Sequence, residues 1–173
     1  MILASALDEF KMLELKMSEA YLWCSIKFED IELRQFFADM SDEELSHARA
    51  LENISKNPKV REINFDIPDY LPDRILQNIN KYFALIKQET ALNEIFLYLA
   101  EMEDSEINQA FDSILKGVNE TKIQQIDFLN INTRRHLLML SKQAEKLDLS
   151  EDVQKKIGQI CVTDRDYFKI FIK

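Results

Sequence analysis

Six acidic and histidine side chains fall on the apolar faces of predicted helices. Each keeps the spacing of three or four residues that its apolar neighbours follow, so we expect it to point inward with them. The six are Glu14, Glu44, His47, Glu103, Glu106 and His136. An ionised carboxylate on a buried face costs several kcal/mol unless something compensates its charge. The central turns of these stripes hold no Lys or Arg, so the pattern indicates a bound metal ion.

The spacing of Glu44 and His47 supports a metal site. They form a Glu-x-x-His pair, and positions i and i+3 of a helix lie on one face about a turn apart. Carboxylates with one imidazole per ion suit iron or manganese better than zinc, which favours Cys and His. A Glu-x-x-His pair from each of two helices, with a Glu from each of two others, is the dinuclear arrangement of carboxylate bundles. The donor types therefore favour iron or manganese, and the arrangement predicts a site for two ions, or for one.

The candidate ligands also lie at matching levels. Glu14 and Glu44 are 30 residues apart, with their midpoint at residue 29, where a turn is expected. Glu103 and Thr133 are also 30 apart, with their midpoint at 118, inside the turn sequence Gly117-Val118-Asn119. Each partner is then about 22 Å along its helix from the turn, at 1.5 Å per residue. Two helix hairpins would place their polar layers at mid-length.

Four long helices are the elements that must position these residues. Only two glycines and three prolines occur among the 173 residues, too few turn residues for a β-rich fold of this size. Hydrophobic residues make up 46 %, enough for one folded domain. Apolar stripes at helical spacing run over 3–28, 33–54, 92–114 and 126–147. The sequence predicts an all-α four-helix bundle over residues 1–147.

The connections between these helices differ in length. The first two helices meet near Glu29-Asp30-Ile31 without a glycine. A long crossover over about 57–89 follows, and Pro58, Pro68 and Pro72 mark it as irregular. We expect extended chain or loop from Val60 to Tyr70, and helix again from Asp73. A break is expected between Gln88 and Leu92, since one helix from Asp73 to Lys116 would be about 66 Å long. Residues 148–173 form a helical extension that packs on the bundle, with Ser150 as its cap.

At these residues the sequence resembles the rubrerythrin branch of the ferritin-like superfamily. The resemblance covers about Leu7 to Leu147. It rests on Glu14 with Tyr21 seven residues later, and on the run Phe37-Ala38-Asp39-Met40-Ser41-Asp42-Glu43-Glu44-Leu45-Ser46-His47-Ala48. In the third helix it rests on Glu103-Asp104-Ser105-Glu106, with Phe111 further along. The resemblance implies that Glu14, Glu44, Glu103 and Glu106 sit at the metals, with His47 and His136 as terminal ligands.

The same resemblance implies an activity. Such proteins bind Fe(II) and react it with peroxide or oxygen, in oxidative-stress defence or iron handling, as a diiron peroxidase or oxidoreductase. Full-length rubrerythrins also carry a rubredoxin-like iron centre. The two cysteines of this chain, Cys24 and Cys161, form no Cys-x-x-Cys pair. An external electron donor is then required.

The fourth helix departs from the family pattern. It reads Thr133-Arg134-Arg135-His136 where a second Glu-x-x-His is expected, and a hydroxyl is a poor ligand for Fe(II). A second hypothesis follows: a diverged bundle without metal that serves as a binding or structural module. Its buried acids would be protonated or paired with an arginine. The candidates are Arg34, Arg49, Arg134 and Arg135.

Other assignments of single residues stay open. Glu89 shares the apolar phase, and a turn at Asp104-Ser105 would pair it with Glu120; the unbroken apolar period through Ile114 disfavours that turn. The acids between Glu101 and Glu106 also fit a solvated face. Tyr21 is expected in the core, where its hydroxyl can bond a site carboxylate.

Composition excludes several functions. A net charge of −9 disfavours nucleic-acid binding, which needs clusters of Lys and Arg. No apolar run approaches the roughly 20 residues of a membrane span, and the first residues do not read as a signal peptide. Two isolated cysteines fit a reducing compartment, so a cytoplasmic location is expected. A homodimer stays open.

Overall fold

The computed structural model describes the 173-residue chain except for residues 1–2, 62–70, 90, 107–123 and 164–173. The described residues form helices and no strand, which confirms the predicted all-α class. The helices are α1 (Leu3–Lys27), α2 (Ile31–Ser55), α3 (Pro58–Arg61), α4 (Leu71–Gln88), α5 (Leu92–Glu106), α7 (Gln124–Lys146) and α8 (Glu151–Thr163). None of them is long and apolar enough to cross a membrane.

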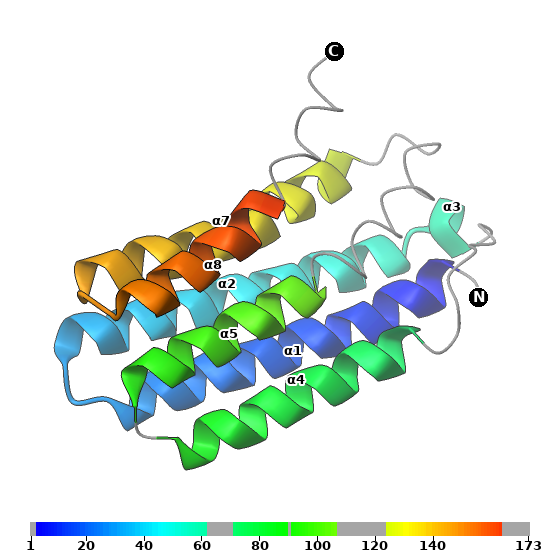
Figure 1. The fold of residues 1–173 in the computed structure, drawn as a ribbon. Coiled ribbons are helices and arrows are strands. Elements are labelled where there is room, and N and C mark those ends of the chain that lie inside the picture. The colour runs from blue at the N-terminus through cyan, green and yellow to red at the C-terminus, as the bar shows by residue number, and fades with distance from the viewer. Residues whose placement is uncertain (1–2, 62–70, 90, 107–123, 164–173) are drawn as a thin grey trace.

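Helices α1 and α2 form the antiparallel hairpin that the sequence predicts, and they share the most extensive helix contact among the described elements (Figure 1). The turn needs no glycine because Asp30 caps α2. Its side chain accepts a hydrogen bond from the backbone N–H of Leu33 at 2.7 Å, which satisfies one of the free amides of the first turn. Helix α1 ends at Lys27 and α2 begins at Ile31, so the turn lies at the predicted midpoint near residue 29.

The crossover contains a long helix that lies beside the hairpin. Helix α4 packs against α1 and α5, and it ends at Gln88 before α5 begins at Leu92. This confirms the predicted break. The Lys27 ammonium at the end of α1 donates hydrogen bonds to the carbonyl of Ile86 in α4 and to that of Glu89 just beyond it, so it caps the C-terminal end of α4.

Two details of the predicted connections change. Val60 and Arg61 belong to the short helix α3, so the prediction of extended chain there is wrong, and the rest of that stretch lies outside the described residues. Helix α5 continues through Asp104 and Ser105, which removes the alternative turn between Glu89 and Glu120. The predicted turn at Gly117-Val118-Asn119 lies outside the described residues.

Helix α8 reverses the chain direction after α7 and packs against α5 and α7. Helices α7 and α8 contact each other, and both contact α5 (Figure 1). The reversal between them passes through Asp148 at φ 51°, a left-handed conformation that Asp tolerates better than most residues. Ser150 precedes α8 as expected, and its carbonyl accepts from the amides of Val153 and Gln154.

An aromatic cluster fills the core between α1, α2 and α5. The Phe37 ring, fully buried, lies 5.2–6.3 Å from four other aromatic rings. They are Tyr21, Phe28, Phe36 and Phe96. Tyr21 ends this cluster, because its hydroxyl reaches a layer of carboxylates and histidines beyond it.

Candidate metal centre

Five of the six predicted site residues come together in one buried layer. Glu14 comes from α1, Glu44 and His47 from α2, Glu103 from α5 and His136 from α7. Each side chain is at most 1 % exposed. Glu106 is the last residue of α5, and its side chain lies outside the described part of the structure. Thr133 lies on α7, one helical turn before His136, and its side chain is likewise not described.

Glu44 lies at the centre of the layer. Its Oε2 lies within hydrogen-bond distance of His47 Nδ1, at 3.0 Å, and its Oε1 lies 2.8 Å from His136 Nδ1. The two imidazole rings stack with their centroids 5.0 Å apart. One carboxylate therefore bridges two histidines that belong to different helices.

The other two carboxylates each lie beside one of the two histidines. Glu14 Oε2 is 3.4 Å from His47 Nδ1, and Glu103 Oε1 is 3.5 Å from His136 Nδ1. The layer thus has two halves that share Glu44, one with Glu14 and His47, the other with Glu103 and His136. One ligand atom each of Glu44, His47 and His136 lies within 4.8 Å of the other two.

The layer is short of hydrogen-bond partners. Five buried atoms in the described structure have none. They are both carboxylate oxygens of Glu14, Oε1 of Glu44, Oε2 of Glu103 and Nδ1 of His136. Although His136 Nδ1 is 2.8 Å from Glu44 Oε1, the two atoms are not aligned for a hydrogen bond. Buried polar atoms are rarely left unpaired in native proteins, and convergent lone pairs of this kind suit a cation.

Burial and the charge of Glu44 raise the pKa values of the two carboxylates beside it, Glu14 and Glu103. Desolvation, followed by the charge of Glu44, raises the pKa of Glu14 well above its usual value. The same two causes raise the pKa of Glu103. No Lys or Arg of the described residues forms an ion pair with either carboxylate or with Glu44. Protonation is therefore one way to neutralise these groups when no other cation is present.

The histidines supply the other positive charges. Burial alone would lower the pKa of His47, but the nearby carboxylates of Glu14 and Glu44, the second of them hydrogen-bonded to Nδ1, raise it to about 10. His136 is raised well above its usual pKa by the charges of Glu44 and Glu103, against the same desolvation. Desolvation opposes ionisation of Glu44, but the positive charge of His136 outweighs it and lowers the pKa of Glu44. The raised pKa values favour protons on both histidines, which balance part of the negative charge of the three carboxylates.

Tyr21 lies where the sequence analysis expected it. Its hydroxyl donates a 2.5 Å hydrogen bond to Glu103 Oε1, linking α1 to α5 across 82 residues of sequence. Burial, and then the negative charge of Glu103, raises the pKa of the phenol. Tyr21 therefore stays protonated and satisfies one oxygen of Glu103.

Glu43 is a site residue that the sequence analysis missed. Its Oε2 is 3.1 Å from His136 Nε2, on the side of the ring that faces away from the layer. Its Oε1 is 3.2 Å from the guanidinium of Arg135. Hydrogen bonding to His136 lowers the pKa of Glu43, so the carboxylate is ionised. The signal available in the sequence was its place beside Glu44; its partners on α7 could be found only from the packing.

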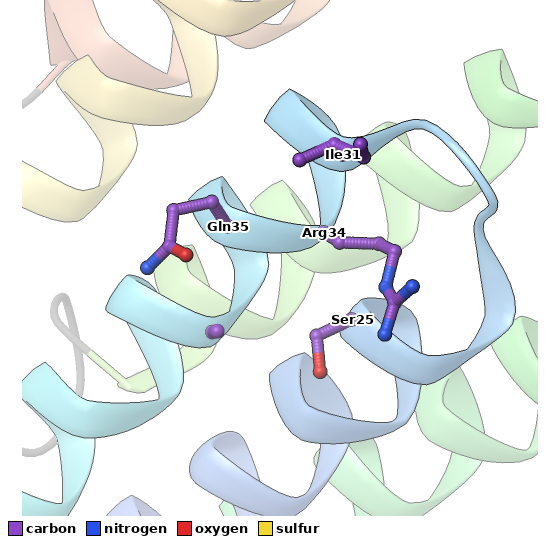
Figure 2. Close-up of a pocket in the computed structure, with 5 residues that line it drawn as sticks. Ser25, Ile31, Arg34 and Gln35 are labelled. Atoms are coloured by element: carbon purple, nitrogen blue, oxygen red, sulfur yellow. The ribbon is translucent and has the colours of Figure 1, made fainter.

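A separate hollow of about 290 Å³ lies near the α1–α2 turn. Figure 2 shows Ser25 of α1 and Arg34 of α2 beside it, with Ile31, Gln35 and Ala38 completing its lining. None of the described residues that line it carries a carboxylate or an imidazole, so they offer no ligand set for a metal.

The fold and site define an all-helical protein with a buried Glu and His cluster that can hold a metal ion. No protein family, curated protein or solved structure matches the chain. The metal-ligand roles of the site residues stay predictions.

Proposed function

We propose that this chain is a ferritin-like, rubrerythrin-like protein that binds non-haem iron, or manganese, between α1, α2, α5 and α7. The observation that carries the proposal is the buried layer of three carboxylates and two histidines in which five polar atoms lack partners. The arrangement of α1–α2 with α5 and α7, the intervening crossover helix and the Glu-x-x-His pair support the ferritin-like assignment.

The donor set favours iron or manganese. Carboxylates are hard ligands and imidazoles are intermediate ones, and the five residues of the layer include no thiolate. Its two halves share Glu44, so two ions would share this carboxylate while each keeps one histidine and one further Glu. Thr133 replaces the carboxylate expected on α7, which makes the half with Glu103 and His136 the weaker position unless Glu106 also contributes.

The chain's own residues hold and orient the site. Tyr21 fixes Glu103, and the aromatic rings around Phe37 close the layer on one side. The protons on His47 and His136 must leave when a metal takes their Nδ1 atoms, because a metal ligand has to be deprotonated. When bound, Fe(II) would supply electrons for the reduction of peroxide or oxygen. An external electron donor would restore the reduced state, in the cytoplasm, for oxidative-stress defence or iron handling.

Metal analysis tests this function. Protein purified without chelator should hold metal, and anaerobic titration with Fe(II) followed by peroxide or oxygen should show Fe(II) oxidation that depends on the protein. Occupancy far below one ion per chain, together with no Fe(II)-dependent oxidation, would refute it. Unchanged binding in Glu44→Ala would refute the location of the site.

A second function rests on the electrostatics of the metal-free layer. Because His47 and His136 can carry the positive charge, the same fold can persist as a bundle without metal that serves as a binding or structural module. Among the described residues, no arginine forms an ion pair with a carboxylate of the layer. Arg135 pairs with Glu43 instead. A ligand that binds only the folded state must raise the melting temperature. No rise with Fe(II) or Mn(II) would favour this second function.

A further inference from the structure

The Nε2 atom of His136 on α7 is hydrogen-bonded to the partly exposed carboxylate of Glu43 on α2. Glu43 is 27 % exposed, while His136 and the rest of the layer are buried. The contact joins Glu43 Oε2 on α2 to His136 Nε2 on α7 at 3.1 Å. Glu43 does not reach the centre of the layer, which is occupied by its neighbour Glu44.

The chemistry of this contact selects one form of the imidazole. Because Glu43 forms an ion pair with Arg135 through Oε1, its Oε2 acts as the acceptor in this contact, and His136 Nε2 carries the hydrogen and donates it. In the neutral ring the lone pair is then on Nδ1, the atom that faces Glu44 at 2.8 Å and Glu103 at 3.5 Å. A carboxylate behind a histidine also increases its strength as a ligand.

Arg135 holds Glu43 in turn. Its guanidinium lies 3.2 Å from Glu43 Oε1, the oxygen that does not contact His136. Arg135 and His136 are adjacent on α7, so the two oxygens of one carboxylate contact successive residues of the same helix. The Glu43 side chain is thereby fixed at both oxygens.

We propose that Glu43 is a positioning residue for the metal centre, which directs His136 Nδ1 toward the metal through a hydrogen bond at Nε2, with Arg135 orienting Glu43. This inference rests on the proposed function. It assigns Glu43 a role distinct from that of Glu44, although the two are neighbours in sequence.

Three variants separate positioning from simple attachment of α2 to α7. Glu43→Leu removes the acceptor, Glu43→Gln keeps one acceptor oxygen without charge, and Arg135→Ala removes the ion pair but leaves the bond to His136. Glu52→Gln is the matched control, because Glu52 is another α2 carboxylate in an ion pair, with Lys56 at 2.7 Å. Far-UV circular dichroism establishes that each variant is folded.

Co(II) is the probe, with two readouts. Titration measures affinity, and we expect a loss of about 10–100-fold in Glu43→Leu, a smaller loss in Glu43→Gln, and the wild-type value in Glu52→Gln. Proton NMR of the Co(II) protein detects the shifted ring N–H signals of bound histidines. One of these should exchange rapidly with water in Glu43→Leu and remain visible in Arg135→Ala.

The outcomes separate the two proposals. If the wild-type protein binds no Co(II), Fe(II) or Mn(II), the proposed function fails and the role of Glu43 falls with it. If the wild-type protein binds Co(II) but Glu43→Leu and Glu43→Gln keep its affinity and its ring N–H signals, only the role of Glu43 is overturned. Equal losses of affinity in Glu43→Leu and Arg135→Ala, with unchanged N–H signals, would also overturn it, because they indicate helix attachment alone.

Discussion

Replacing Glu44 by Gln removes the one carboxylate that contacts both histidines while keeping the size of the side chain. Its oxygens lie 3.0 Å from His47 Nδ1 and 2.8 Å from His136 Nδ1. Both halves of the layer therefore lose a ligand charge at once. Glu14→Gln is the matched comparison, because Glu14 is equally buried but contacts only His47 among the two histidines.

The expected magnitude follows from binding linkage. At a metal concentration one hundred times Kd, binding adds about 2.7 kcal/mol to the free energy of unfolding. For a chain of this size, each kcal/mol raises Tm by about 2–4 °C, so the wild-type protein should gain about 5–11 °C. A hundredfold loss of affinity in Glu44→Gln leaves about 0.4 kcal/mol at the same metal concentration, a rise of about 1–2 °C. Glu14→Gln should keep part of the rise, since the half with Glu103 and His136 is intact.

The metal-free proteins supply the baseline. Leaving a buried charge without its partner costs about 3–5 kcal/mol. We expect Glu44→Gln to lie at the lower end, because it also relieves the repulsion that Glu44 exerts on Glu14 and Glu103. Melting curves of both variants with and without Mn(II) give the two quantities separately. A full metal-induced rise in Glu44→Gln would refute the assignment of Glu44 as the shared ligand.

Three further predictions concern the same layer. The free energy of unfolding of the metal-free protein should fall as pH rises from about 6.5 to the His47 pKa of about 10, because the folded state binds the His47 proton more tightly than the unfolded state does. Denaturant titrations across this interval measure the free energy of unfolding. A value that stays constant or increases with pH contradicts the prediction. Tyr21→Phe should destabilise the metal-free protein by about 1–3 kcal/mol through loss of its bond to Glu103, whereas Tyr82→Phe, at a half-buried tyrosine on α4, serves as the control in the same denaturant titration. Thr133→Glu should increase the amount of Fe(II) or Mn(II) bound per chain in equilibrium dialysis, because it restores a second Glu-x-x-His pair; unchanged stoichiometry and affinity would count against Thr133 as the missing ligand position.

Local signals determined most of the fold that could be predicted. The period of apolar residues identified α1, α2, α5 and α7, because each helix must bury one face. The break before Leu92 followed from the length limit of a compact bundle, and Asp30 supplies a cap where no glycine marks the turn. The placement of α4 against α1 and α5 was not predicted, since the apolar face of a helix does not identify its partner.

The residues of the candidate site could be predicted for a different reason. Phase along each helix selected side chains that face inward, and equal distance from a turn placed Glu14 and Glu44 at one level, where both contact His47 Nδ1. Glu43 lies at the same level but failed the criterion of phase. It lies at the edge of the inward face of α2, and its role depends on Arg135 and His136 of α7, whose position relative to α2 is a property of the packed structure.

The same side chains should give metal binding and metal-free stability opposite dependences on pH. Protons on His47 and His136 stabilise the metal-free layer, so its stability declines as pH rises through their raised pKa values. A metal must displace those protons, so its affinity should increase over the same interval. A cluster of buried ion pairs with no metal function would show only the decline. Mn(II) affinity and denaturant stability measured in one series of buffers therefore distinguish a metal centre from a structural network, and an affinity that falls or stays constant with pH would contradict coordination through these two histidines.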